Sequence, residues 1–270
     1  MRRTVRAALP LQDSGPIPNE PPSATLTYLL DGWDLHDDLG HDAAMTFSPA
    51  KAALDLGFYS NDLDASQTFW GTTVGLAYEE MLKVGGGIHQ HRYTLHGAVL
   101  KSNVSRDPLD AGTSGFVRLR LAADVETPTA VVHPDAVDIQ LVPFGYHGIT
   151  ATEITIAARS VDRTASLLIE AFDTKPEGGR LRIGETLIAF DHQPHRPLAG
   201  PYRASGFTYL TAQVFDVAKQ HARFLRKGFT EGLAPVRLGD TAAISFVLLP
   251  DGDWLELSQR ASLVGNLPDL

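Results

Sequence analysis

Three stretches in the second half of the sequence carry polar side chains at every second position. Residues 153–158, 207–214 and 254–258 show this alternation, which is typical of strands with one apolar and one polar face. The polar rows contain two carboxylates and a phenol: Glu153, Tyr209 and Glu256. Such a set can hold a hard cation such as Mg²⁺ or Mn²⁺. Without a metal, two close carboxylates repel, which raises one pKa toward neutrality and provides a general acid or base. In the third interpretation both glutamates are hydrogen-bonded to neighbouring polar groups and have no chemical role.

Two histidines form a rival candidate site. His89 and His91 flank Gln90, so a strand at this position places both imidazoles on one face. A His-x-His pair on a strand is a workable pair of metal ligands. The glycines at 85–87 precede it and favour a mobile loop, so the alternative is that the two histidines line a substrate path.

The composition excludes several other classes of site. None of the 270 residues is a cysteine, which excludes disulfides, zinc–thiolate sites, iron–sulfur clusters and cysteine nucleophiles. The formal net charge is −9 and the pI is about 5.5, which disfavours nucleic acid and anionic membranes as partners. The glycine-rich phosphate motifs and the G-x-S-x-G nucleophile motif are absent.

The first 50 residues differ from the rest of the chain. Residues 10–22 contain five prolines, which is typical of an extended segment, either a disordered tail or an arm that lies over the body or over a neighbouring subunit. Residues 31–42 contain five Asp and no Lys or Arg, which favours a solvated acidic loop over a cation site. The apolar run after the basic start spans only residues 7–9, whereas a signal peptide needs about 7–15 apolar residues and a membrane span roughly 18. The expected location is therefore cytoplasmic.

The elements that position these side chains recur along the chain. A strand, a capped helix and two or three further strands repeat from about residues 54, 148 and 206. The expected helices span about 65–74, 162–172 and 216–227. A weaker copy begins near Gly115 and has no convincing helix. Strands with short capped helices predict an α+β fold.

Two stretches carry a resemblance to a known family. Residues 56–70 (LGFYSNDLDASQTFW) resemble the opening strand and helix of the vicinal oxygen chelate superfamily, the glyoxalase, bleomycin-resistance and extradiol-dioxygenase group. Residues 246–257 (FVLLPDGDWLEL) resemble its closing hairpin. The resemblance covers about residues 54–260 and implies repeated βαβββ modules forming two curved-sheet, glyoxalase-like domains. The expected division is an arm and acidic loop (1–50), a first domain with a degenerate second half (51–146) and a second domain (147–262).

The resemblance also implies where a metal would bind. Family ligands stand on the first and last strands of a module, which assigns Glu153, Tyr209 and Glu256 to one cavity of the second domain. They would hold Mg, Mn, Zn or Fe, with Glu153 and Tyr209 as catalytic residues. The remaining polar residues of the same rows would line the substrate cavity: Thr155, Thr211, Gln213 and Trp254. The matching positions elsewhere, which are less suited to a metal, are Asp55, Lys101 and Gln140.

The expected function is a small-molecule enzyme. A divalent metal would polarise paired oxygens of the substrate and stabilise an enolate-like intermediate, in isomerase or lyase-type chemistry. One alternative is a metal-free protein that binds or sequesters a small ligand. The other is a divergent ring-cleaving dioxygenase that uses His89, His91 and a carboxylate. The substrate and the oligomeric state stay open, a homodimer being one option.

Overall fold

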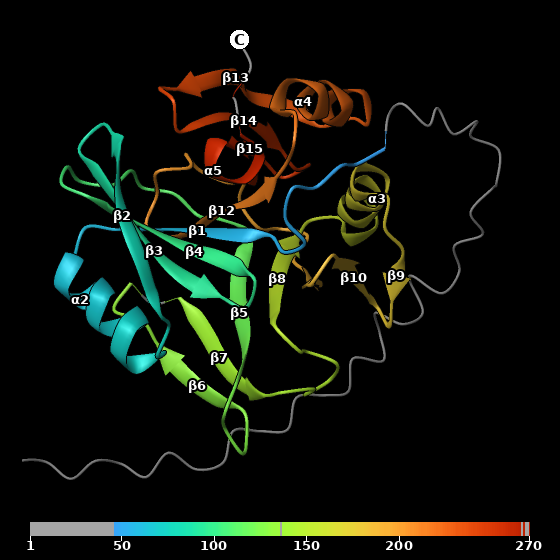
Figure 1. Cartoon of the computed structure of the whole chain (residues 1–270). Coiled ribbons are helices and arrows are strands. Elements are labelled where there is room, and N and C mark those ends of the chain that lie inside the picture. Colours follow the sequence, from blue (N-terminus) through green and yellow to red (C-terminus); the bar gives the residue numbers. More distant parts are fainter. Residues whose placement is uncertain (1–45, 136, 266, 268–269) are drawn as a thin grey trace, which may run out of the picture.

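The computed structural model describes residues 46–135, 137–265, 267 and 270 (Figure 1). Most of the expected arm and acidic loop at 1–50 therefore lies outside the described residues. Phe47, near the start of the described chain, packs its ring against those of Phe172 and Phe224. Among the described residues, no helix has both the length and the apolar character needed to cross a membrane.

Four modules follow one another along the chain. The first contains β1 (Asp55–Ser60), α2 (Leu63–Thr68), the π-helical turn η2 (Phe69–Thr73), β2 (Tyr78–Gly85), β3 (Ile88–Leu95) and β4 (Ala98–Ser105). The second contains β5 (Phe116–Ala123), β6 (Thr129–Val132) and β7 (Asp138–Pro143). The third contains β8 (Thr152–Ala158), α3 (Val161–Phe172), β9 (Pro176–Glu177), β10 (Arg180–Ile183) and β11 (Thr186–His192). The fourth contains β12 (Gly206–Gln213), α4 (Val217–Arg226), β13 (Thr230–Leu238), β14 (Ala242–Leu248) and β15 (Trp254–Arg260), and α5 (Ala261–Val264) follows.

The module helices α2, α3 and α4 begin within two residues of their expected starts. The side chains of Asp62, Ser160 and Asp216 each accept a hydrogen bond from the backbone N–H three residues later, which caps α2, α3 and α4. The first helix differs from the expected span of 65–74, because it ends at Thr68 and continues as η2, which buries Phe69 and Trp70. The segment between β5 and β6 forms no helix, so the second module lacks the helix that the other three contain.

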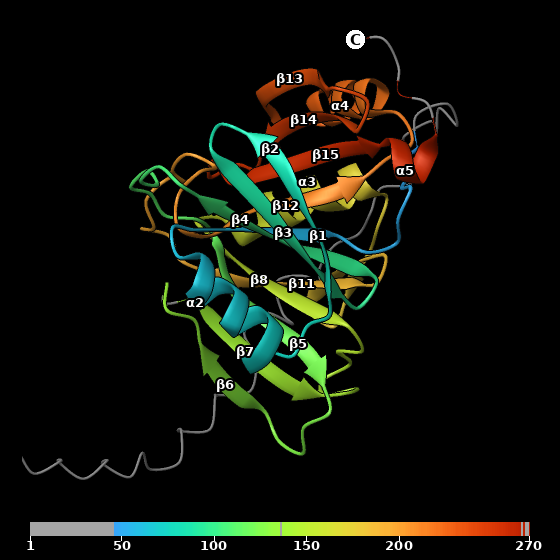
Figure 2. The ribbon, with the colours of Figure 1, turned by 60° about the vertical axis from the view of Figure 1, so that its left-hand side comes forward.

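The strands form two curled mixed sheets. The first sheet has eight strands in the order β13-β14-β15-β12-β1-β4-β3-β2, and the second has seven in the order β6-β7-β5-β8-β11-β10-β9. The first module thus shares a sheet with the fourth through β1 and β12, and the second shares one with the third through β5 and β8. The expectation that the first module shares a sheet with the second, and the third with the fourth, is therefore wrong, and a division at residue 147 does not separate the two sheets. Figure 2 shows the first sheet in the upper part of the molecule and the second in the lower part.

One hydrophobic core joins the two sheets. Leu56 and Phe58 from the first sheet and Leu119 and Ile154 from the second belong to the same buried cluster, together with apolar side chains of α3 and α4. The apolar rows of β12 and β15 also lie in this cluster, as the alternation predicts. Their polar rows consequently face the opposite side of the first sheet, away from the helices.

Candidate functional site

The side of the first sheet that faces away from the shared core is called here the inner face. Its side chains come from strands that are remote in sequence, because β4 and β3 reach it from the first module and β12 and β15 from the fourth. Arg92 on β3 lies opposite Lys101 on β4, and Thr211 on β12 lies opposite Glu256 on β15. The inner face carries Asp55, Tyr59, Gln90, Arg92, Val99, Lys101, Asn103, Tyr209, Thr211, Gln213, Trp254 and Glu256.

A buried ion pair stands at the centre of the inner face. The Lys101 Nζ donates to Glu256 Oε2 at 2.6 Å and to Thr211 Oγ1 at 2.8 Å. The Thr211 hydroxyl also donates to Glu256 Oε2, at 2.6 Å. Lys101 is 3 % exposed and Glu256 is 7 % exposed, so water screens the pair poorly. The charge of Glu256 is therefore balanced by a cation that belongs to the chain.

Tyr209 lies beside this pair as a neutral phenol. Its hydroxyl accepts a hydrogen bond from Asn103 Nδ2 at 3.0 Å, and the Lys101 Nζ lies 5.6 Å from its ring centroid. Burial, and after it the negative charge of Glu256, raise the pKa of Tyr209 well above its usual value. An anionic phenolate ligand at this position is consequently disfavoured.

The ring of Tyr209 occupies the space that Gly57 leaves open. A Cβ atom at residue 57 would lie 2.1 Å from Tyr209 Cε1, which is far inside van der Waals contact. We expect Gly57→Ala to displace the ring and to destabilise the protein by about 1–3 kcal/mol, the usual range for overpacking. Urea unfolding measures the loss, and the weakened aromatic packing should appear in near-UV circular dichroism.

Gly71→Ala is the matched control for this substitution. A Cβ at residue 71 meets its nearest atom, in Tyr93, at 3.9 Å, an ordinary contact. The packing argument fails if both alanine variants unfold at the same urea concentration.

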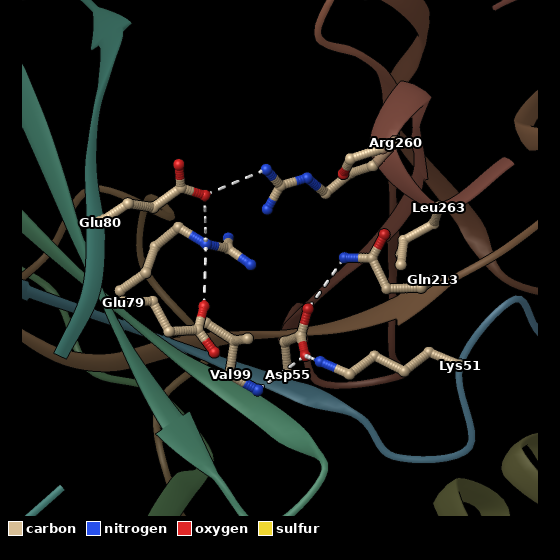
Figure 3. A pocket seen from close by; sticks show the side chains of 10 residues that line it. Lys51, Asp55, Glu79, Glu80, Val99, Gln213, Arg260 and Leu263 are labelled. Carbon is tan, nitrogen blue, oxygen red and sulfur yellow. Dashed lines mark hydrogen bonds and ion pairs between the residues drawn. The ribbon is translucent and has the colours of Figure 1, made fainter. Parts of the chain in front are cut away.

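A cavity of about 250 Å³ opens at one end of the inner face (Figure 3). Its wall contains Asp55, whose Oδ1 accepts hydrogen bonds from Lys51 Nζ and from Val99 N, both at 2.8 Å. The other carboxylate oxygen, Oδ2, accepts a hydrogen bond from Gln213 Nε2 at 2.8 Å. The full lining is Lys51, Asp55, Glu79, Glu80, Arg92, Val99, Gln213, Arg260, Ser262 and Leu263.

An aromatic cluster closes the other end of the inner face. Tyr59, Tyr209 and Phe246 form its buried part, with Tyr202 and Trp254 packed against them. The Trp254 indole donates to the backbone oxygen of Gly200 at 2.9 Å, which holds the loop before β12 against the sheet. Trp254 thus packs against the loop that contains Gly200.

Glu153 is not part of this site. It lies on β8 in the second sheet, where Arg120 Nη1 and Arg180 Nη1 lie 2.9 and 2.8 Å from its two carboxylate oxygens. The prediction that Glu153 shares one cavity with Glu256 and Tyr209 is wrong, because β8 pairs with β5 and β11 whereas β15 pairs with β12 and β14. Thr155, predicted to line the same cavity, also lies on β8 in the second sheet, so that prediction is wrong as well. The structure does bring five predicted residues together on the first sheet: Tyr209, Thr211, Gln213, Trp254 and Glu256.

The histidine pair lies on the opposite side of β3. His91 is buried and its Nδ1 is 3.3 Å from Gln67 Nε2 on α2, while His89 is exposed. Burial, and after it the neighbouring His89, lower the pKa of His91. The pair therefore faces α2 and does not join Glu256. Within the parts of the chain that the structure describes, no three His, Cys, Asp or Glu residues are grouped so that they could hold a metal ion.

Sequence reasoning missed that Lys101 pairs with Glu256 and that Asn103 donates to Tyr209. Lys101 and Asn103 were visible as polar residues at alternate positions of a strand, next to the apolar Val99. A lysine in a strand is usually exposed, so nothing local indicated that this ammonium is buried against a carboxylate.

Comparison with solved structures defines the fold. The chain is similar to glyoxalase I from Zea mays, with a TM-score of 0.61, 13% identity and coverage of 77% of this chain and 92% of that one. A mutant of that enzyme matches with a TM-score of 0.60 and 14% identity, over 76% of this chain and 92% of the mutant chain. A candidate dioxygenase from Bacillus subtilis matches with a TM-score of 0.56 and 12% identity, over 83% of this chain and 92% of that chain. No family model and no curated protein sequence matches the chain. The chain has the vicinal oxygen chelate fold, built from glyoxalase-like α+β modules.

The residues of the inner face do not fit the divalent metal that the resemblance implies. The carboxylate of Glu256 is held by an ammonium and a hydroxyl, both on Oε2, and Tyr209 is a neutral phenol. A divalent cation bound to Glu256 would lie next to the Lys101 ammonium and would be repelled by several kcal/mol at this depth. Hard cations are held by oxygen ligands, usually with more than one carboxylate. The expected trio of metal ligands is accordingly not formed.

Proposed function

We propose that the protein binds a small polar molecule on the inner face of the first sheet and needs no divalent metal to do so. The observation that carries this proposal is the Lys101 ammonium, which lies 2.6 Å from Glu256. It supplies positive charge at the place where the expected metal would have acted. The cavity beside Asp55 and Gln213 gives a small molecule room to bind.

A metal titration tests the metal-free part of the proposal. We expect the melting temperature of the wild-type protein to be the same in EDTA, Mg²⁺, Mn²⁺ or Zn²⁺. Lys101→Glu places a second carboxylate beside Glu256, and we expect this variant to bind Mn²⁺, with about 2.7 kcal/mol of stabilisation at a hundredfold excess of metal over Kd. Stoichiometric metal in the wild-type protein that Glu256→Gln loses would contradict the proposal.

Proton transfer is a second candidate function, because an acid and a base meet in one hydrogen-bonded network. Lys101 and Thr211 both contact Glu256, and Tyr209 lies beside them. A substrate oxygen that takes the Lys101 ammonium as its partner frees Glu256 to abstract a proton, while the ammonium stabilises the oxyanion. This chemistry is that of an isomerase or a lyase. Deuterium exchange into a bound ligand, followed by NMR, should stop in Glu256→Gln while the ligand still binds.

A further inference from the structure

Two positively charged guanidinium groups converge on the cavity beside Asp55. Arg92 is 5 % exposed and lines the cavity from β3, and Arg260 lines it from the end of β15. Burial, and after it the charge of Arg260, lowers the pKa of Arg92, while the negative charges of Asp55, Glu79 and Glu80 act in the opposite direction. Two like charges in one small cavity require an anion near both of them.

The carboxylates of the chain meet this requirement only loosely. Glu80 Oε1 lies 3.5 Å from Arg92 Nε and 3.4 Å from Arg260 Nη2, and Glu79 Oε2 lies 3.7 Å from Arg92 Nε. Ordinary charge-assisted N–H···O bonds are about 2.7–2.9 Å long, so these contacts are long. The Nε of Arg92 is buried and has no hydrogen-bond partner. The side chain of Glu80 is 48 % exposed, so it can turn away from the two arginines into the solvent.

An unpartnered acceptor lies in the same wall. Gln213 is 1 % exposed and its Oε1 has no hydrogen-bond partner. The orientation of this amide is fixed, because its Nε2 donates to Asp55 Oδ2 at 2.8 Å and the opposite orientation would place two oxygens together. Figure 3 shows Gln213 beside Asp55, Arg260 above Gln213, and Glu80 across the cavity on the left. The wall thus combines two guanidinium groups with one amide oxygen that lacks a donor.

We infer that this cavity binds a small carboxylate that carries a hydrogen-bond donor, such as an α-hydroxy or α-amino acid. The carboxylate takes the place of Glu80 between Arg92 and Arg260, and the donor of the ligand reaches toward Gln213 Oε1. This inference rests on the proposed function, because it names the class of molecule that the inner face binds.

Calorimetric titration with glycolate, glycine, acetate and chloride, at constant ionic strength, tests the inference. We expect glycolate or glycine to bind more tightly than acetate, which lacks the donor, and chloride not to compete. Loss of a charge-assisted hydrogen bond should weaken binding of the better probe about tenfold or more in Arg260→Gln. Glu80→Gln should tighten it, because the competing carboxylate is removed. Arg182→Gln removes the same charge from the second sheet, where Arg182 pairs with Glu177, and should leave the affinity unchanged.

The outcomes separate the ligand class from the proposed function. Equal binding of all four probes, or binding that Arg260→Gln and Glu80→Gln leave unchanged, would overturn the inference. If the carboxylates fail while uncharged molecules bind and compete with one another at this cavity, the ligand class is wrong and the proposed function stands. If neither carboxylates nor a panel of uncharged small molecules binds, both fail.

Discussion

Replacing Lys101 by methionine is expected to lower the free energy of unfolding at neutral pH by about 3–5 kcal/mol, the range measured when one partner of a buried ion pair is removed. The variant leaves the carboxylate of Glu256 buried without the ammonium that now lies 2.6 Å from it. Thr211 remains as a hydrogen-bond donor, but a hydroxyl carries no compensating charge. Urea unfolding followed by circular dichroism measures the difference.

A double-mutant cycle separates the ion pair from simple loss of packing. In Lys101→Met combined with Glu256→Gln the buried charge is gone, so we expect the double variant to be clearly more stable than Lys101→Met alone. Lys51→Met is the control, because that lysine also pairs with a buried carboxylate, Asp55, but its own side chain is partly exposed. A Lys101→Met protein within about 1 kcal/mol of the wild type would match the value of a surface pair and would contradict the buried site.

Much of the fold is visible in the sequence because its signals are local. Helix caps such as Asp62 and Asp216 act within three residues, and alternation along a strand acts within two. These patterns predict the modules, the apolar faces that form the shared core, and the polar face that carries Tyr209 and Glu256.

The pairing of modules is not local, and the errors follow from it. Each module begins with a similar strand, and any of these strands can pair with another through its backbone. The repeat alone therefore does not show whether β1 pairs with β5 or with β12. Because β1 pairs with β12, Lys101 comes to lie against Glu256 across 155 residues of sequence. Glu153, assigned to the same cavity, lies on the second sheet between two arginines. One change of partner strand thus replaces an expected second carboxylate by an ammonium.

A second buried ion cluster joins the two sheets. Arg196 Nη2 lies 2.5 Å from Asp253 Oδ2, and its Nε lies 3.5 Å from Asp251 Oδ2. Both aspartates belong to the hairpin between β14 and β15, yet they also bind the second sheet. Asp253 Oδ1 accepts from Gly115 N at 2.5 Å, before β5, and Asp251 Oδ2 accepts from Arg159 N at 2.7 Å, after β8.

Removal of the arginine should therefore weaken the contact between the sheets. We expect Arg196→Met to cost about 3–5 kcal/mol at pH 8, since it leaves two buried carboxylates without their cation. The loss should be smaller at pH 5, where Asp253 can take up a proton. A loss at pH 8 that equals the loss at pH 5 would show that the arginine acts through packing alone.

The pH dependence of the wild-type protein follows from Asp253. Burial outweighs the attraction of Arg196 and the Gly115 N–H, and it raises the pKa of Asp253 from 3.8 to about 6. Between these two values the folded state binds more protons than the unfolded state, so the stability that this group contributes is full below pH 4. It falls as the pH rises to about 6, by about 3 kcal/mol at most. Asp253→Asn should remove this component, so the stability of the wild type relative to the variant should decline from pH 4 to pH 6. Asp240→Asn, at a fully exposed carboxylate, should leave the slope unchanged, and identical slopes in the wild type and Asp253→Asn would refute the assignment.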